Sequence, residues 1–175
     1  RSLFAAWRIL RFDANAMSYF NLTLEGFWRS FAAAGLVLPF YLMLPGLQFI
    51  HLTTLIEAEA TPSQLAMSQV SLLGFVVVEA LAFAAAWAAW PLLMTPVARF
   101  FGLDSRYVPY IIAANWGSVL RYTLLLFVQF LVYSGLLGQQ PAGALFVIAY
   151  VSVLYYDYLI ARTALECDAL TAIGL

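Results

Sequence analysis

The sequence lacks most of the residues from which catalytic and metal sites are built. Its 175 residues contain no lysine, one cysteine (Cys167) and one histidine (His51). A single cysteine cannot form a disulfide within the chain, and a single histidine leaves too few ligands for a metal or haem site. We therefore predict no cofactor, although His51 could still act as the lone ligand of a pigment.

The chain is also poor in charge. Charged residues make up 10% of it, and its eight arginines form no dense basic patch, so we expect no nucleic-acid partner. Hydrophobic residues make up 65% of the chain, against about half in a typical soluble domain. Because a domain of this size cannot hide so much apolar surface from water, we predict that its solvent is lipid.

Four apolar segments are long enough to cross a bilayer, whose hydrocarbon core needs about 20 helical residues. We predict spans at about residues 27–50, 69–94, 110–137 and 142–162, which gives an all-α, polytopic transmembrane helix bundle over residues 21–175. In the second span, Ala80, Ala84 and Ala88 recur every fourth residue. This spacing lets two helix backbones approach closely in lipid.

Two of these segments contain residues that disfavour a regular helix. Pro39 and Pro45 should kink or end the first span. Asn115-Trp116-Gly117 should interrupt the third apolar stretch, leaving an interfacial or partly re-entrant piece before a span from about Ser118.

Residues 1–20 are predicted to form an interfacial amphipathic segment. At helical spacing Arg1, Arg8 and Arg11 share one arc, and Trp7 lies with other large apolar side chains largely opposite. We predict that these three arginines contact lipid headgroups and that Trp7 lies in the membrane boundary. A cap over the helix bundle is the alternative. At the other end the chain turns apolar at Ala169, which indicates the stub of a possible fifth helix.

The arginines predict the orientation of the chain. Seven of them flank the spans on one side only, and the two loops on the other side, 51–68 and 138–141, contain none. The arginines of that group are Arg1, Arg8, Arg11, Arg29, Arg99, Arg106 and Arg162. Because positive charge is retained in the cytoplasm during insertion, we predict a cytoplasmic N-terminus and four crossings.

Among the polar side chains inside the predicted spans, Glu79, Arg121 and Asn115 are the candidates for a buried polar site. A charge at that depth is costly, so we expect Glu79 to be paired or protonated, with Arg121 and Asn115 as its partners. A structural pair that fixes helix register is favoured over a polar transport pathway, because a transporter usually contains more buried polar groups. Asp157 and Arg162 are interpreted as interfacial charges.

Several stretches resemble those of bacterial Yip1-type membrane proteins. They are Gly26-Phe27-Trp28-Arg29-Ser30-Phe31, the Pro-containing first span, Tyr110-Ile111-Ile112-Ala113-Ala114-Asn115-Trp116 and Ile160-Ala161-Arg162-Thr163-Ala164-Leu165. The resemblance covers about residues 25–175. It implies a bundle of about five helices in the bacterial inner membrane, of which this sequence shows four and a stub. Eukaryotic relatives are linked to small GTPases and vesicle traffic, but no residue here carries that role over.

The function that these features favour is that of a non-enzymatic membrane scaffold or accessory subunit. It would pack against lipids and against other membrane-protein subunits, or associate with itself. The alternative is a small transporter or channel built around Glu79, Arg121 and Asn115. No sequence pattern typical of a phosphate loop, a nucleophile elbow or a zinc site is present in the chain.

Overall fold

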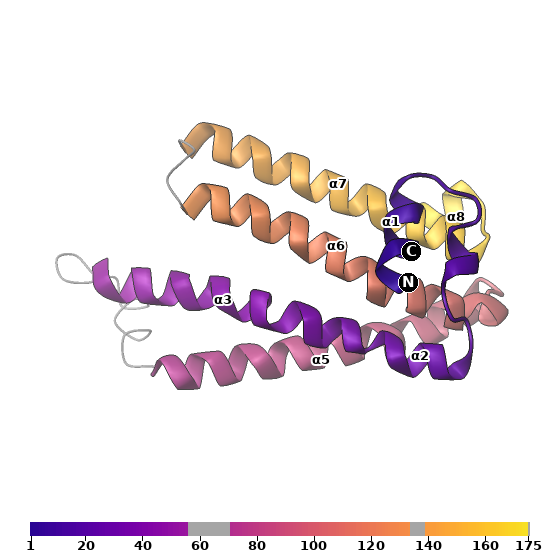
Figure 1. Ribbon diagram of the computed structural model, residues 1–175, viewed down its shortest axis with the longest axis horizontal. Helices are drawn as coiled ribbons and strands as arrows, with labels where there is room; N and C mark the ends of the chain where they lie inside the picture. The colour runs from indigo at the N-terminus through magenta and orange to yellow at the C-terminus, as the bar shows by residue number, and fades with distance from the viewer. Residues whose placement is uncertain (56–70, 134–138, 175) are drawn as a thin grey trace.

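The computed structural model describes the backbone of residues 1–55, 71–133 and 139–174, and the side chains of residues 1–43, 46, 71–132 and 141–174. The structure is 87% helix and has no strand in these ranges, which confirms the all-α fold class (Figure 1). The helices are α1 (Ser2–Leu10), α2 (Leu24–Ser30), α3 (Ala32–Leu55), α5 (Leu72–Phe100), α6 (Tyr107–Tyr133), α7 (Gln139–Leu165) and α8 (Ala169–Gly174), with 3-10 turns η1 (Ala16–Tyr19) and η2 (Asp104–Arg106).

Three apolar segments of the described structure are long enough to cross a membrane. They lie at Leu72–Phe100, Asp104–Val132 and Pro141–Leu165, and they coincide with the second, third and fourth predicted spans. The first predicted span corresponds to α2 and α3. At 24 residues α3 is about 36 Å long, enough for the hydrocarbon core, and it runs beside α5 (Figure 1). Whether α3 crosses the membrane stays a prediction.

The predicted interruption at Asn115-Trp116-Gly117 is wrong, because α6 is one continuous helix through these residues. Gly117 lies where α6 and α7 approach closely: a Cβ built on it would come 2.5 Å from Ile160 Cδ1. The glycine therefore permits tight packing rather than ending the helix. In the first segment α3 continues past Pro39 and Pro45 to Leu55, so the prolines do not end the helix, and a kink at them stays a prediction.

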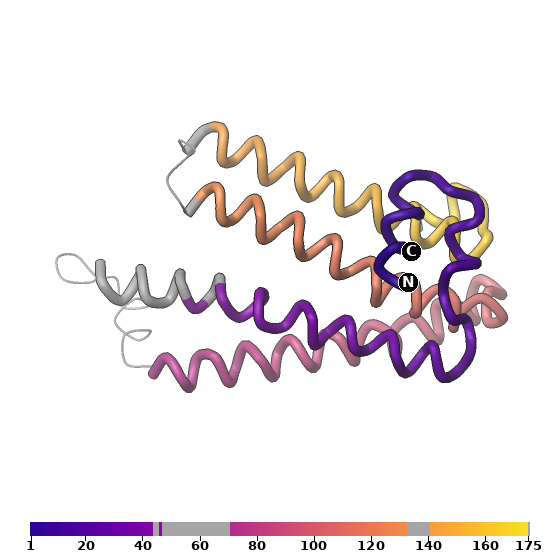
Figure 2. Tube along the Cα trace, viewed as in Figure 1, coloured from indigo at the N-terminus to yellow at the C-terminus, as the bar shows by residue number. Residues whose placement is uncertain are grey.

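The core lies at one end of the bundle and is centred on α6. Ile111 and Ile112 of α6 pack there in one buried cluster with Ile9 of α1 and Ile160 of α7. Both termini lie at this end (Figure 2). Helix α6 therefore connects the N-terminal elements to α7.

Helix α1 forms a cap on α6 and α7. Ala5, Ala6 and Ile9 are fully buried against them, and the Tyr156 hydroxyl donates a hydrogen bond to the Ala6 carbonyl at 2.8 Å. Trp7, on another face of α1, remains 47% exposed. The contacts thus match the capping alternative, and contact of this helix with lipid headgroups stays a prediction.

All seven arginines outside the interior of the bundle lie at the same end. They lie in or directly beside α1, in α2, in the last turn of α5, in η2 and in the last turn of α7, which Figure 1 shows together with both termini. Helix α8, which begins at Ala169 where the sequence turns apolar, lies there too. The fold therefore gathers segments that are far apart in the sequence into one arginine-bearing end.

Candidate functional site

Arg121, inside α6, forms an ion pair with Asp157 of α7. Its Nη1 donates to Asp157 Oδ1 at 2.5 Å, and its Nη2 donates to the Ala114 carbonyl at 3.2 Å. The side chain reaches back over seven residues of α6, or about 10 Å, since helical side chains tilt toward the N-terminus. Arg121 therefore extends toward the arginine-bearing end, where Asp157 of the antiparallel α7 meets it.

Arg121 does not pair with Glu79, its predicted partner. Glu79 Oε2 instead accepts a hydrogen bond from the Tyr41 hydroxyl of α3 at 3.0 Å. Glu79 lies seven residues from the start of α5, whereas Arg121 lies twelve residues from the end of α6. Those two helix ends point the same way (Figure 1), and the Arg121 side chain extends away from them toward Ala114.

Asn115, the third predicted member, also has a separate partner. Its Nδ2 donates to Ser30 Oγ at 2.8 Å, and Ser30 Oγ donates to the Phe27 carbonyl at 2.6 Å. On the other side, Ser118 Oγ donates to the Asn115 carbonyl at 2.5 Å. All three polar side chains belong to buried residues, so this network satisfies them while it ties α2 to α6.

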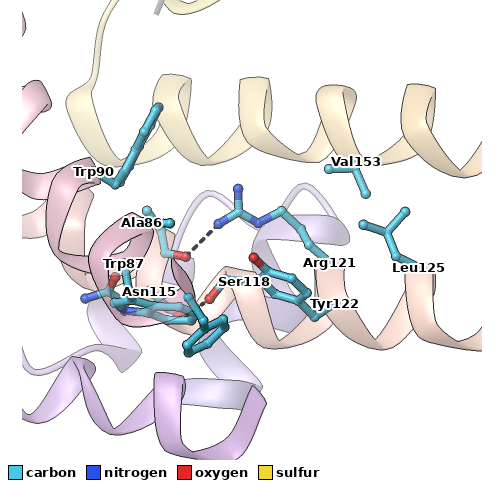
Figure 3. Close-up of a pocket in the computed structure, with 11 residues that line it drawn as sticks. Ala86, Trp87, Trp90, Asn115, Ser118, Arg121, Tyr122, Leu125 and Val153 are labelled. Carbon is cyan, nitrogen blue, oxygen red and sulfur yellow. Dashed lines mark hydrogen bonds between the residues drawn. The ribbon is translucent and has the colours of Figure 1, made fainter. Parts of the chain in front are cut away.

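A cavity of about 300 Å³ lies beside Arg121, between α5, α6 and α7 (Figure 3). Trp87 and Trp90 of α5 and Tyr122 of α6 supply aromatic walls, and Asn115 and Arg121 supply polar ones. Two buried donors, Trp87 Nε1 and Arg121 Nε, have no hydrogen-bond partner among the described residues. A polar cavity of this size has room for water that could satisfy such groups. Because Asp157 already pairs with Arg121, the cavity offers donors rather than an unpaired charge.

An aromatic cluster adjoins this cavity and joins α3, α5 and α6. The ring centroid of Phe83 lies 4.8 Å from that of Tyr41 and 5.1 Å from that of Trp87, and Tyr122 lies 6.3 Å from Trp87. Such offset and tilted pairs are favourable contacts between aromatic rings. The cluster therefore holds the Tyr41 hydroxyl where it reaches Glu79.

The residues predicted to contact lipid headgroups differ in their surroundings. Arg8 pairs with Asp13, and its guanidinium lies 5.5 Å and 5.1 Å from the ring centroids of Phe4 and Tyr19. The hydrogen bond from Arg8 lowers the pKa of Asp13. Arg8 is therefore engaged within the N-terminal segment, whereas Arg1 and Arg11 form no ion pair in the described part of the chain.

Asp157 is the member of this site that the sequence analysis missed, since it was interpreted as an interfacial charge beside Arg162. Arg162 instead donates to the Tyr158 hydroxyl at 2.9 Å. One signal pointed to Asp157: it is the acidic residue within the fourth predicted span, next along the chain from the span that contains Arg121. Sequential antiparallel helices are usually neighbours, so this carboxylate was the nearer candidate.

His51, the one histidine, has its side chain outside the described residues. Comparison of the chain with protein family models, with curated proteins and with solved structures finds no match. The resemblance to Yip1-type proteins therefore stays a prediction, and a function must be inferred from the arrangement described above.

Proposed function

We propose that this chain is a non-enzymatic integral membrane protein whose helix α5 packs against a helix of a second subunit in the membrane. The observation that carries this proposal is a mismatch between polarity and burial. The most apolar stretch of α5 has a mean hydropathy of 2.1, yet only 6% of it is buried within the chain. A helix that is apolar on all sides must be covered by protein or by lipid.

The surface of α5 also favours a helix as its cover. Ala82, Ala84, Ala86 and Ala88 are exposed on it, so the alanine spacing noted in the sequence is largely unused within the chain. Small side chains let a second helix come close, which is how transmembrane helices associate without a hydrophobic driving force. The second subunit would be another copy of this chain or a different membrane protein.

The transporter alternative gains no support from the polar residues on which it depended. Within the described structure, Glu79 bonds Tyr41, Arg121 pairs with Asp157 and Asn115 bonds Ser30. Asn115 and Arg121 line one cavity, but Glu79 does not, and each of the three residues is engaged with a different partner. Each contact has the character of a structural link between two helices, which is the role expected in a scaffold.

The proposed subunit contact can be tested with a photo-crosslinking amino acid at Leu81, an exposed apolar residue of α5. In native membranes we expect protein adducts from position 81 but only lipid adducts from Val151, a similarly exposed position on α7. Ala84→Leu should abolish the protein adduct by blocking close approach, while Ala144→Leu on α7 should not. If position 81 yields only lipid adducts, lipid covers α5 and the proposal fails.

We further propose four crossings, with the arginine-bearing end in the cytoplasm of a bacterial inner membrane. The shared position of seven arginines supports this orientation, because cytoplasmic loops are enriched in positive charge. In a Cys167→Ala background, a membrane-impermeant thiol reagent should label Glu59→Cys from outside and leave Asp104→Cys unlabelled. Glu59 lies outside the described residues, and the sequence around it, residues 51–68, contains no arginine. The reverse labelling would overturn the orientation.

A further inference from the structure

A second cavity, of about 640 Å³, lies at the arginine-bearing end between α1, α2, α3 and α6. Its lining combines two kinds of side chain. Arg1, Arg29 and Asn21 provide polar groups, and Leu36, Ile112 and Trp116 provide apolar ones. Its volume lies within the range of about 300–1,000 Å³ that is usual for ligand sites.

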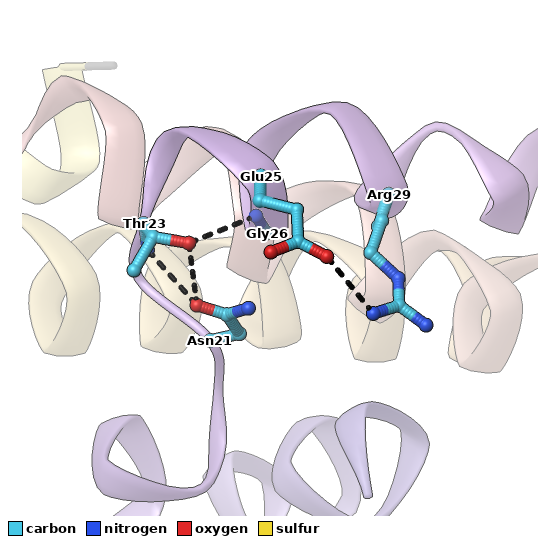
Figure 4. Close-up of polar contacts among 5 residues, drawn as sticks. All are labelled: Asn21, Thr23, Glu25, Gly26 and Arg29. Atoms are coloured by element: carbon cyan, nitrogen blue, oxygen red, sulfur yellow. Dashed lines mark hydrogen bonds and ion pairs between the residues drawn. The ribbon is translucent and has the colours of Figure 1, made fainter.

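The start of α2 fixes the polar part of this cavity (Figure 4). Thr23 Oγ1 accepts a hydrogen bond from the Gly26 amide at 3.2 Å, and Asn21 Oδ1 accepts from the Thr23 hydroxyl at 2.7 Å. A Cβ on Gly26 would lie 1.8 Å from the Asn21 carbonyl oxygen, so only glycine lets this turn fold onto the helix. The turn thereby places Asn21 beside α2, and Asn21 and Arg29 both line this cavity.

The cavity has an excess of positive charge. The Arg1 guanidinium forms no ion pair within the described residues, and Arg29 pairs with Glu25 at 3.2 Å. The side chains of that pair are 74% and 72% exposed, so their attraction is weak and a stronger anion could compete for Arg29. The positive charge of this cavity therefore favours an anionic ligand.

We propose that this cavity binds one anionic phospholipid. Its phosphate would accept hydrogen bonds from Arg1 and Arg29, since guanidinium groups match the geometry of phosphate oxygens. The first part of an acyl chain would lie on Leu36 and Trp116, with Leu36 leading along α3 toward the apolar part of the bundle. Basic pockets at the cytoplasmic ends of transmembrane helices bind anionic headgroups in this way.

Three other cavities are lined by Arg121, whose charge is paired with Asp157, so none of the three combines an unpaired cation with an apolar wall. The lipid site rests on the proposed membrane location but not on a subunit contact at α5. A monomer in detergent should therefore still bind the lipid if the α5 proposal fails, and the two proposals can be separated.

The test is native mass spectrometry of the full chain in detergent, titrated with dioleoylphosphatidylglycerol, with dioleoylphosphatidylcholine or with inorganic phosphate. We expect one tight site for phosphatidylglycerol and no comparable site for phosphatidylcholine or phosphate. Arg1→Gln and Arg29→Gln should each weaken phosphatidylglycerol binding about fivefold. Arg99→Gln is the matched control, because Arg99 pairs with Asp104 at the same end, is 73% exposed and does not line the cavity. It should change the Kd less than twofold.

Three results would overturn the proposal. Equal weakening by Arg99→Gln would mean diffuse attraction to the arginine-bearing end. Tight binding of inorganic phosphate alone would mean an anion site without a role for the acyl chain. Equal affinity for the two lipids would mean that charge does not select the occupant. Exposed surface arginines rarely affect folding, and equal melting temperatures of the lipid-free variants would confirm that each Kd refers to folded protein.

Discussion

Helices α5 and α6 invert the usual relation between polarity and burial. The most apolar stretch of α5 has a mean hydropathy of 2.1 and is 6% buried, whereas that of the span containing α6 has a mean hydropathy of 1.5 and is 44% buried. In a water-soluble domain the more apolar helix would be the more buried one. The inversion is expected where lipid surrounds the bundle, because lipid tolerates apolar side chains and the interior can then hold the polar ones.

The polar residues of α6 support this interpretation. Asn115 and Ser118 are 5% and 4% exposed, and Arg121 reaches between α6 and α7 to Asp157. Leu81 of α5 is 66% exposed, and Ile111 of α6 is fully buried. Helix α6 is thus the interior element that links its neighbours through specific contacts. Helix α5 presents an apolar surface whose cover, in our proposal, is a second subunit.

The largest effect should come from truncating equivalent apolar residues on the two helices. Ile111→Ala should lower the free energy of unfolding by about 2–4 kcal/mol, since it leaves a cavity among α1, α6 and α7. Leu81→Ala should change it by less than about 0.5 kcal/mol, because that side chain has little contact within the chain. Unfolding of the detergent-solubilised protein with increasing amounts of a denaturing detergent measures both values.

This pair of variants tests whether α5 and α6 differ in burial. A loss from Leu81→Ala as large as that from Ile111→Ala, in a sample shown to be monomeric, would mean that the outer face of α5 is packed within the chain. The low burial of α5 would then not be a property of the protein, and lipid would not be needed to explain it. A loss of stability in Ile111→Ala alone would support the contrast in burial between α5 and α6.

Hydropathy was sufficient to predict three long apolar helices, because a segment of about 20 apolar residues has few alternatives in lipid. The second, third and fourth predicted spans each coincide with an apolar helical segment in the structure. The internal features of a span were harder to predict. Asn115 and Gly117 resemble residues that end helices, yet Gly117 admits Ile160 and Asn115 bonds Ser30. These roles depend on neighbouring helices, which local sequence does not reveal.

The partner of Arg121 could not be identified only from which residues lie inside the predicted spans. Glu79 and Arg121 both lie inside predicted spans, and their proximity was inferred from that shared location. The true partner depends on the direction of the arginine side chain along α6 and on which helix lies beside it, α7 rather than α5. The presence of polar residues inside the spans could thus be predicted from the sequence, but Asp157 was not counted among them and the pairing was therefore wrong.

A smaller change in the free energy of unfolding is expected from the Arg121–Asp157 ion pair, which joins α6 and α7. Asp157→Asn should cost about 2 kcal/mol, between the roughly 0–1 kcal/mol of a surface pair and the roughly 3–5 kcal/mol of a fully buried one. The intermediate value follows from side-chain exposures of 24% for Arg121 and 38% for Asp157. Arg121→Gln should cost less, because the remaining carboxyl can take up a proton whereas an arginine left alone stays charged.

The matched control is Asp104→Asn, which breaks the Arg99–Asp104 pair, whose side chains are 73% and 62% exposed. It should cost no more than about 0.5 kcal/mol, since exposed pairs contribute little. The double variant Asp157→Asn/Arg121→Gln should be no less stable than Asp157→Asn alone if the two groups act only on each other. If Asp157→Asn costs no more than Asp104→Asn, the interior of α6 and α7 is well hydrated. Its polar pair would then resemble a surface contact, and the contrast between α5 and α6 would lose its physical basis.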